Sequence, residues 1–139
     1  MSDSAELYQA LIMARSRQPR FAGPLATFDS QGTGDNPMCG DRVQVYLRRA
    51  DTGVGHVSRG CAIMSASADL MAEAVAGKSA AEIAVLSTAF EAMVTSGAQD
   101  PALGDLNALA GVSGYRSRIR CATLPWSALA DALADDGEG

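Results

Sequence analysis

Lysine is what the sequence most clearly lacks. Its 139 residues carry 11 Lys and Arg against 16 Asp and Glu, which gives a net charge of −5, and Lys78 is the single lysine. Binding to a nucleic-acid backbone requires clustered Lys and Arg, so we expect no nucleic-acid partner. The acidic balance favours solubility and leaves a basic or partly basic protein partner open.

Long apolar runs are also missing. No stretch approaches the roughly 20 consecutive apolar residues that a membrane-spanning helix needs. The first six residues are acidic and do not follow the basic-then-apolar order of a secretory signal. We therefore expect a cytoplasmic protein with no membrane partner.

Cysteine is scarce and odd in number, with Cys39, Cys61 and Cys121 as the complete set. Thiols stay reduced in the cytoplasm, so three of them need not pair. Three thiols in such a compartment favour metal ligands or reactive groups over a disulfide framework. Each cysteine taken alone is equally compatible with a small, buried apolar residue.

Turn-forming residues and the alternation of apolar and polar residues predict a small sheet in the N-terminal half of the chain. Strands are expected at 25–30, 42–50 and 55–59, with a turn-rich stretch at 32–37 between the first two. In the second strand Val43, Val45 and Leu47 fall on one face. A short turn between the second and third strands predicts that they run antiparallel.

Helical periodicity dominates the rest of the chain. Helices are expected at 5–17, 65–76, 79–93, 101–112 and from 115 or 117 to 134. Ser79 with Glu82 three residues later is the pattern of a capping box. Because the strands come first and most helices follow, we predict an α+β fold. It would be a single domain, residues 1–139, with a three-stranded antiparallel sheet and helices mainly on one face.

Four residues suggest chemistry. Cys39 and Asp41 flank Gly40 before the second strand, and residues two apart in an extended chain point to the same side. One thiolate and one carboxylate make half of a tetrahedral zinc site. Cys61 lies where the third strand gives way to a helix, whose N-terminus favours a thiolate. Cys121 lies in the last helix, and spacing alone does not bring these segments together.

Several motifs resemble, in chain order, those of the IscU/SufU/NifU family of iron–sulfur assembly proteins. Segment 36–41, NPMCGD, resembles the family motif N-P-x-C-G-D, and 60–68, GCAIMSASA, resembles G-C-x-I-S-x-A-S-A. Residues 77–78 match the G-K that follows, and 120–126, RCATLPW, resembles R-x-K-C-A-x-L-x-W. Residues 7–20 resemble the opening helix and its N-P-R. The resemblance covers nearly the whole chain and implies the family's α+β fold.

Two features are similar to the SufU branch of this family. Arg120 stands where IscU proteins have a histidine before the third cysteine, and an extra segment, 98–114, precedes that cysteine. Residues 14–17 differ from the histidine-and-tyrosine stretch that SufU relatives tend to have. That difference concerns contacts with partners more than the metal site.

The resemblance implies a site and a function. The implied metal ligands are Cys39, Asp41, Cys61 and Cys121. The implied function is a zinc-dependent sulfurtransferase, in which Cys39 accepts persulfide sulfur from a SufS-type cysteine desulfurase and passes it toward an iron–sulfur scaffold complex. Asp41, a harder ligand than a thiolate, is expected to keep the site open to exchange.

Two alternatives stay open. The protein could be a scaffold on which a [2Fe–2S] or [4Fe–4S] cluster is built and passed on. It could also be an interaction module with a structural zinc ion and no chemistry of its own. Metal content and stimulation of the desulfurase distinguish these hypotheses.

The remaining polar candidates have simpler explanations beside the functional ones. A zinc site with three thiolates and a carboxylate keeps a net negative charge, so Arg42, Arg118 and Arg120 are candidates to compensate it. Each is otherwise a solvated surface arginine. His56, the single histidine, is close to Cys61 in sequence, but we expect it on the surface of its strand. Trp126 and the methionines are expected in the core or at its rim.

Overall fold

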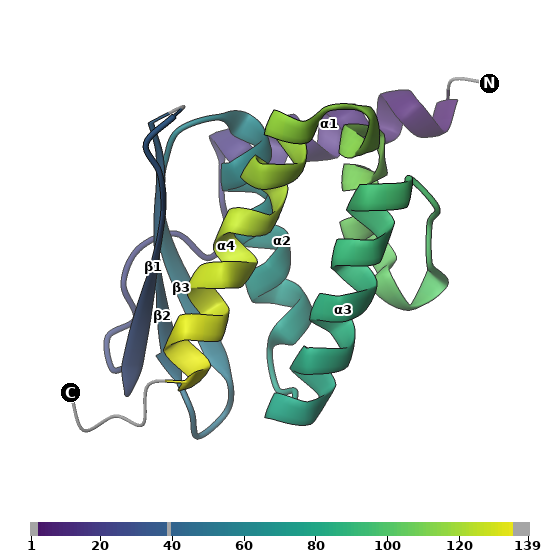
Figure 1. The fold of residues 1–139 in the computed structure, drawn as a ribbon. Coiled ribbons are helices and arrows are strands. Elements are labelled where there is room, and N and C mark those ends of the chain that lie inside the picture. The colour runs from purple at the N-terminus through teal and green to yellow at the C-terminus, as the bar shows by residue number, and fades with distance from the viewer. Residues whose placement is uncertain (1–2, 39, 135–139) are drawn as a thin grey trace.

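A three-stranded antiparallel sheet with helices on one face forms the protein, which confirms the predicted α+β fold. The computed structural model describes residues 3–38 and 40–134. Figure 1 shows the sheet at one side, helices α2 and α4 against it, and α3 with η1 beyond them. The elements are α1 (Asp3–Arg17), β1 (Ser30–Asn36), β2 (Asp41–Arg48), β3 (Gly53–Arg59), α2 (Ala62–Val75), α3 (Ala80–Ser96), η1 (Pro101–Gly114) and α4 (Arg116–Ala134).

Strand β2 is the centre of the sheet, paired antiparallel with β1 on one side and β3 on the other. Val43, Val45 and Leu47 are buried toward the helices, as their alternation predicts. Burying such a side chain contributes about 1.5–3 kcal/mol relative to leaving it in water. The apolar face of β2 therefore anchors α2 and α4 to the sheet.

The prediction for the first strand was wrong. Strand β1 runs from Ser30 to Asn36 and includes the glycine-rich stretch that we expected to be a turn. A Cβ atom at Gly32 would overlap the carbonyl oxygen of Ala128, and one at Gly34 would lie 2.9 Å from that of Leu124. These glycines let the backbone of α4 approach the strand closely, a use of glycine distinct from turn formation.

The helices follow the predicted order with shifted ends. Helix α2 begins three residues earlier than expected, at Ala62. The capping box of Ser79 and Glu82 is present at the start of α3, which continues to Ser96 and ends on Gly97 at φ 80°. Segment η1 is a 3₁₀ helix with a break at Gly104. It packs against α3 and α1.

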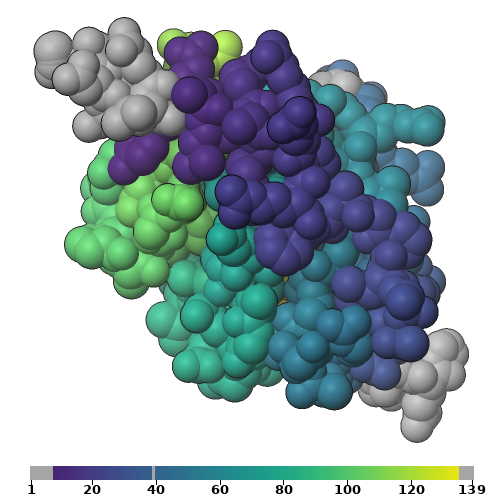
Figure 2. All heavy atoms as spheres, turned by 180° about the vertical axis from the view of Figure 1, so that it is seen from behind, coloured from purple at the N-terminus to yellow at the C-terminus, as the bar shows by residue number. Residues whose placement is uncertain are grey.

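The core lies between the sheet and α3. Phe90 of α3 stacks on Trp126 of α4 with ring centroids 4.8 Å apart, and Met64, Met71 and Met93 are fully buried. This agrees with the expected core position of Trp126. Seen from behind, α1 and the segment after it lie across α2, with η1 alongside (Figure 2). Among the described residues, no helix is both long and apolar enough to cross a membrane.

Candidate metal centre

Three elements begin at the same end of the molecule and carry the candidate ligands there. Strand β2 starts at Asp41, α2 starts directly after Cys61, and Cys121 lies in the second turn of α4. One ligand atom from each of these three side chains lies within 4.8 Å of the others. The structure therefore brings together three of the four residues predicted from the sequence.

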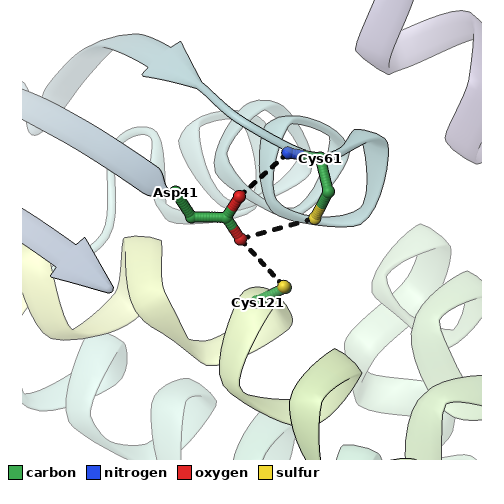
Figure 3. A group of neighbouring side chains, drawn as sticks. All are labelled: Asp41, Cys61 and Cys121. Carbon is green, nitrogen blue, oxygen red and sulfur yellow. Dashed lines mark hydrogen bonds between the residues drawn. The ribbon is translucent and has the colours of Figure 1, made fainter. Parts of the chain in front are cut away.

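The carboxylate of Asp41 is the centre of this cluster (Figure 3). Its Oδ2 accepts hydrogen bonds from the thiols of Cys121, at 2.8 Å, and Cys61, at 3.5 Å. Its Oδ1 accepts a hydrogen bond from the backbone N–H of Cys61 at 3.0 Å. Asp41 and Cys121 are buried, and Cys61 is partly exposed, so the cluster is reached from solvent beside Cys61.

The backbone around Cys61 explains how it meets Asp41. Gly60 has φ 146°, and a Cβ there would clash with the Asp41 side chain. Cys61 itself is the N-cap of α2, and its sulfur accepts a hydrogen bond from the N–H of Met64 at 3.4 Å. The positive end of the helix dipole favours negative charge on this sulfur.

Helix α4 holds Cys121 through contacts on both sides of it. The hydroxyl of Ser67 donates to the carbonyl oxygen of Ala122 at 2.6 Å, which joins α4 to α2. Pro125, inside α4, has no N–H to donate to the carbonyl of Cys121 one turn earlier. Ala128, one turn further on, is fully buried against β1. The position of Cys121 therefore depends on how α4 packs on both layers.

The electrostatics of the cluster suit a bound cation. Burial raises the pKa of the Cys121 thiol far above its ordinary value, and the neighbouring Asp41 and Cys61 add to this rise. A metal ion among the ligands reverses that preference, because coordinating thiols lose their protons. Two sulfurs and one carboxylate oxygen match the donor types that Zn²⁺ and iron–sulfur clusters take in proteins. The described residues are thus suitable ligands for a zinc ion or for an iron–sulfur cluster.

The fourth predicted ligand, Cys39, lies outside the described residues. Its neighbours place the chain near the cluster, because Gly40 directly precedes Asp41. Gly40 has φ 73° and donates its N–H to the carbonyl of Asn36 at 2.9 Å. Met38 is 86% exposed. The described residues on either side of Cys39, Met38 and Gly40, therefore lie at the surface.

His56 is not on the strand surface, and that prediction was wrong. It is 1% exposed, and its Nε2 lies 2.9 Å from Oδ1 of Asp69 in α2. Its Nδ1 lies 2.8 Å from the hydroxyl of Ser58. The histidine faces the helical layer because β3 is covered by α2. Its partner is thus a buried carboxylate of the helical layer.

Arg15, which the sequence analysis did not single out, completes this second cluster. Its Nε donates to Oδ2 of Asp69 at 2.6 Å, and its Nη1 donates to Glu73 at 2.7 Å. Arg15 lies four residues after Leu11, on the inward stripe of its helix, and that spacing is the signal that identifies it. Segment 14–17, which differs from the SufU relatives, therefore contains a residue that is buried in the interior of the fold.

The three arginines proposed to compensate the site are all exposed. Arg42 follows Asp41, Arg120 precedes Cys121, and the guanidinium of Arg118 lies 4.5 Å from the centre of the Tyr115 ring. Their side chains are thus solvated beside the cluster.

Comparison with known proteins places this fold and site in a family. Residues 7–122 match the family model described as NifU-like N terminal domain. The chain is 36% identical to the zinc-dependent sulfurtransferase SufU of Bacillus subtilis (strain 168), covering 96% of this chain and 93% of that protein. It is 34% identical to the iron–sulfur cluster assembly scaffold protein IscU of Streptococcus pyogenes serotype M1, covering 96% and 86%.

A solved structure agrees with these relatives. A candidate iron–sulfur cluster assembly scaffold protein for the SUF system from Fervidobacterium islandicum AW-1 superposes with a TM-score of 0.81 at 31% identity. The match covers 94% of this chain and 98% of that one. The chain belongs to the family of NifU-like N-terminal domains, which includes the IscU and SufU proteins.

Proposed function

We propose that this protein is a zinc-dependent sulfurtransferase that accepts persulfide sulfur from a SufS-type cysteine desulfurase for iron–sulfur cluster assembly. The observation that carries the proposal is the convergence of Asp41, Cys61 and Cys121 from three elements. The similarity to a zinc-dependent sulfurtransferase over 96% of the chain supports it. Arg120, in place of the histidine of IscU proteins, supports the same branch.

Cys39 is the proposed sulfur acceptor. Its thiolate attacks the outer sulfur of the donor's persulfide, so a new S–S bond forms on Cys39 while the donor's S–S bond breaks. The donor cysteine leaves as a thiolate, and no net oxidation occurs. The glycine at position 40 and the exposed Met38 indicate a surface turn that a bulky donor can reach.

The remaining three residues hold the proposed ion. Bound zinc keeps its thiolate ligands deprotonated and supplies no redox chemistry of its own. Cys61 and Cys121 are fixed by helices α2 and α4, whereas Asp41 contributes a harder oxygen ligand. The two sulfurs would therefore anchor the ion, and Asp41 would be its more weakly held ligand.

A scaffold function is the second candidate. The IscU protein of Streptococcus pyogenes, named a cluster assembly scaffold, is 34% identical over nearly the whole chain. Cysteine sulfurs are the ligands that iron–sulfur clusters take, so the same cluster of side chains suits this role. Protein purified without oxygen separates the two: one tightly bound zinc ion favours the sulfurtransferase, and a labile, coloured iron–sulfur centre favours the scaffold.

The decisive experiment measures desulfurase turnover and sulfur acceptance with Cys39→Ala. We expect the wild-type protein to stimulate the desulfurase and to carry one persulfide per chain, and Cys39→Ala to lose both. Zinc content measured on the same samples shows whether the ion is retained. Stoichiometric persulfide on Cys39→Ala would overturn the assignment of Cys39, and full stimulation by that variant would favour a structural-zinc module.

A further inference from the structure

Half of the chain's arginines surround the candidate metal centre. Strands β2 and β3 contribute one each, as Cα partners across the sheet, and the start of α4 contributes three. All five are exposed. We call this set the arginine rim; it consists of Arg42, Arg59, Arg116, Arg118 and Arg120.

The rim differs from most of the other arginines, since Arg15, Arg20, Arg48 and Arg49 contact acidic side chains or backbone carbonyls. Arg15 bonds Asp69, and Arg48 forms an ion pair with Asp51 at 2.9 Å. At the rim, the strand register puts one exposed carboxylate, Asp35, opposite Arg42. Among the side chains that the structure describes at this end, five guanidinium groups stand against this carboxylate and the buried Asp41, which gives a local positive charge.

Two of the three rim arginines of α4 stand where the helix itself disfavours them. The first turn of α4 contains Arg116 and Arg118 and no acidic residue. The N-terminus of a helix carries partial positive charge, so cations there oppose the helix dipole and each other. The folding of α4 does not explain these residues, and positions that break a local rule in this way are common at functional surfaces.

Exposed apolar side chains accompany the charge. Met38 is 86% exposed and Tyr115 is 54% exposed, and the Tyr115 ring carries Arg118 on its face. A groove of about 770 Å³ between α1 and η1 adjoins the same end, with Ile63 and Arg118 among its lining residues. Arg, Tyr and Met are enriched in protein interfaces, whereas Lys and Glu are depleted.

We infer that the arginine rim, with Met38 and Tyr115, is a docking surface for an acidic face of a protein partner. The inference rests on the proposed function, in which that partner is the sulfur donor whose persulfide must reach this end. The whole-chain charge of −5 favours a basic partner, but the surface around the site has the opposite sign. The rim would speed and orient the encounter, and the apolar side chains would hold the complex.

The test compares two charge reversals of equal size at opposite ends of the molecule. Arg116→Glu/Arg120→Glu alters the rim, and Arg48→Glu/Lys78→Glu alters the end of β2 and the start of the α2–α3 connection. Glutamate at the start of α4 suits the helix dipole, so the rim variant should fold. Association of each zinc-loaded protein with the SufS-type desulfurase encoded in the same genome is measured by surface plasmon resonance over a range of salt concentrations.

We expect the rim variant to associate about tenfold or more slowly at low salt, with a flatter salt dependence, and the control to match the wild type. Tyr115→Ala should instead raise the dissociation rate and leave the salt dependence unchanged. Equal effects of the two reversals, no effect of either, or loss of zinc from the rim variant with unchanged association would each overturn the inference. In that last case the arginines would serve the charge of the metal site.

The outcomes also separate this inference from the function on which it rests. If wild-type protein binds the desulfurase through the rim but accepts no sulfur, the proposed function fails and the docking surface stands. If it accepts sulfur while the rim variant associates normally, the docking surface fails and the function stands.

Discussion

Two buried carboxylates, Asp69 and Asp41, have opposite surroundings. Asp69 accepts hydrogen bonds from Arg15, from His56 and from the backbone N–H groups of Arg20 and Phe21, at distances of 2.6–3.0 Å. Asp41 accepts a hydrogen bond from the backbone N–H of Cys61 and faces the sulfurs of Cys61 and Cys121, which are weak hydrogen-bond donors. The first carboxylate has a guanidinium and three further N–H donors inside the protein, whereas the second lies beside two thiols, whose sulfurs are common metal ligands.

The contrast separates a structural cluster from the candidate metal centre. A buried ion that is paired and fully hydrogen-bonded fixes the elements that supply its partners, here α1, α2 and β3. A buried carboxylate beside two thiols suits an additional cation instead. Burial alone does not distinguish the two, since both side chains are at most 1% exposed.

The largest effect should come from Asp69→Ala. This change leaves the Arg15 guanidinium buried without its main partner, and we expect it to lower the free energy of unfolding by about 3–5 kcal/mol. Urea unfolding followed by circular dichroism measures the change. A loss below about 1 kcal/mol would show that the cluster is not structural, contrary to the comparison.

Cys61→Ser tests the opposite region. Serine is also a good N-cap, so the stability of the metal-free protein should change by less than about 1 kcal/mol. Zinc affinity should fall on the order of 100-fold, more than for loss of an outer hydrogen-bond partner. Competition with a chelator measures the affinity. Ser79→Ala, at the cap of α3, is the matched control: it should lose about 1 kcal/mol of stability and keep its zinc.

Acid should weaken the structural cluster. Burial by itself would raise the pKa of Asp69, but its hydrogen bonds with His56, Arg20, Arg15 and Phe21 hold that pKa well below the ordinary value of 3.8. The contribution of Asp69 to stability is therefore complete above about pH 4 and declines as the pH falls below it. Unfolding of the wild type and Asp69→Asn between pH 7 and pH 3 should show curves that converge in acid. Parallel curves would contradict the assignment.

Glu73→Gln should have the smallest effect. Glu73 bonds Arg15 at 2.7 Å, but its side chain is 44% exposed. We expect a loss of about 0.5–1 kcal/mol, within the range of solvent-screened pairs. The same urea titration measures it beside Asp69→Ala. If Glu73→Gln cost as much as Asp69→Ala, Arg15 rather than Asp69 would be the centre of the cluster.

Local patterns predicted much of the fold. The alternation of β2 and the capping box at Ser79 depend on neighbours in sequence, so both could be read directly and both are confirmed. The position of the first strand could not be predicted in this way. Gly32 and Gly34 make room for helix α4, which begins more than 80 residues later. The sequence alone does not distinguish a glycine needed for a turn from a glycine that allows a helix to pack closely on a strand.

The Asp41 and Asp69 clusters also differed in how far the sequence predicted them. Motif resemblance predicted that Asp41, Cys61 and Cys121 belong together, and the structure brings these three side chains to one place. No motif linked His56 to Asp69 and Arg15, which lie 13 and 41 positions away in the chain. Their pairing depends on α1 crossing α2, and side-chain patterns within one element do not encode that crossing.

The order in which the chain is made has a consequence for the metal centre. Asp41 and Cys61 emerge from the ribosome early, but Cys121 lies on the last helix, which must settle against Gly32 and Gly34 before its sulfur reaches the other two. A nascent chain that ends before α4 therefore offers two of these three ligands. If the centre holds zinc as proposed, tight binding would require the finished chain, and an unfinished one would compete only weakly for the ion.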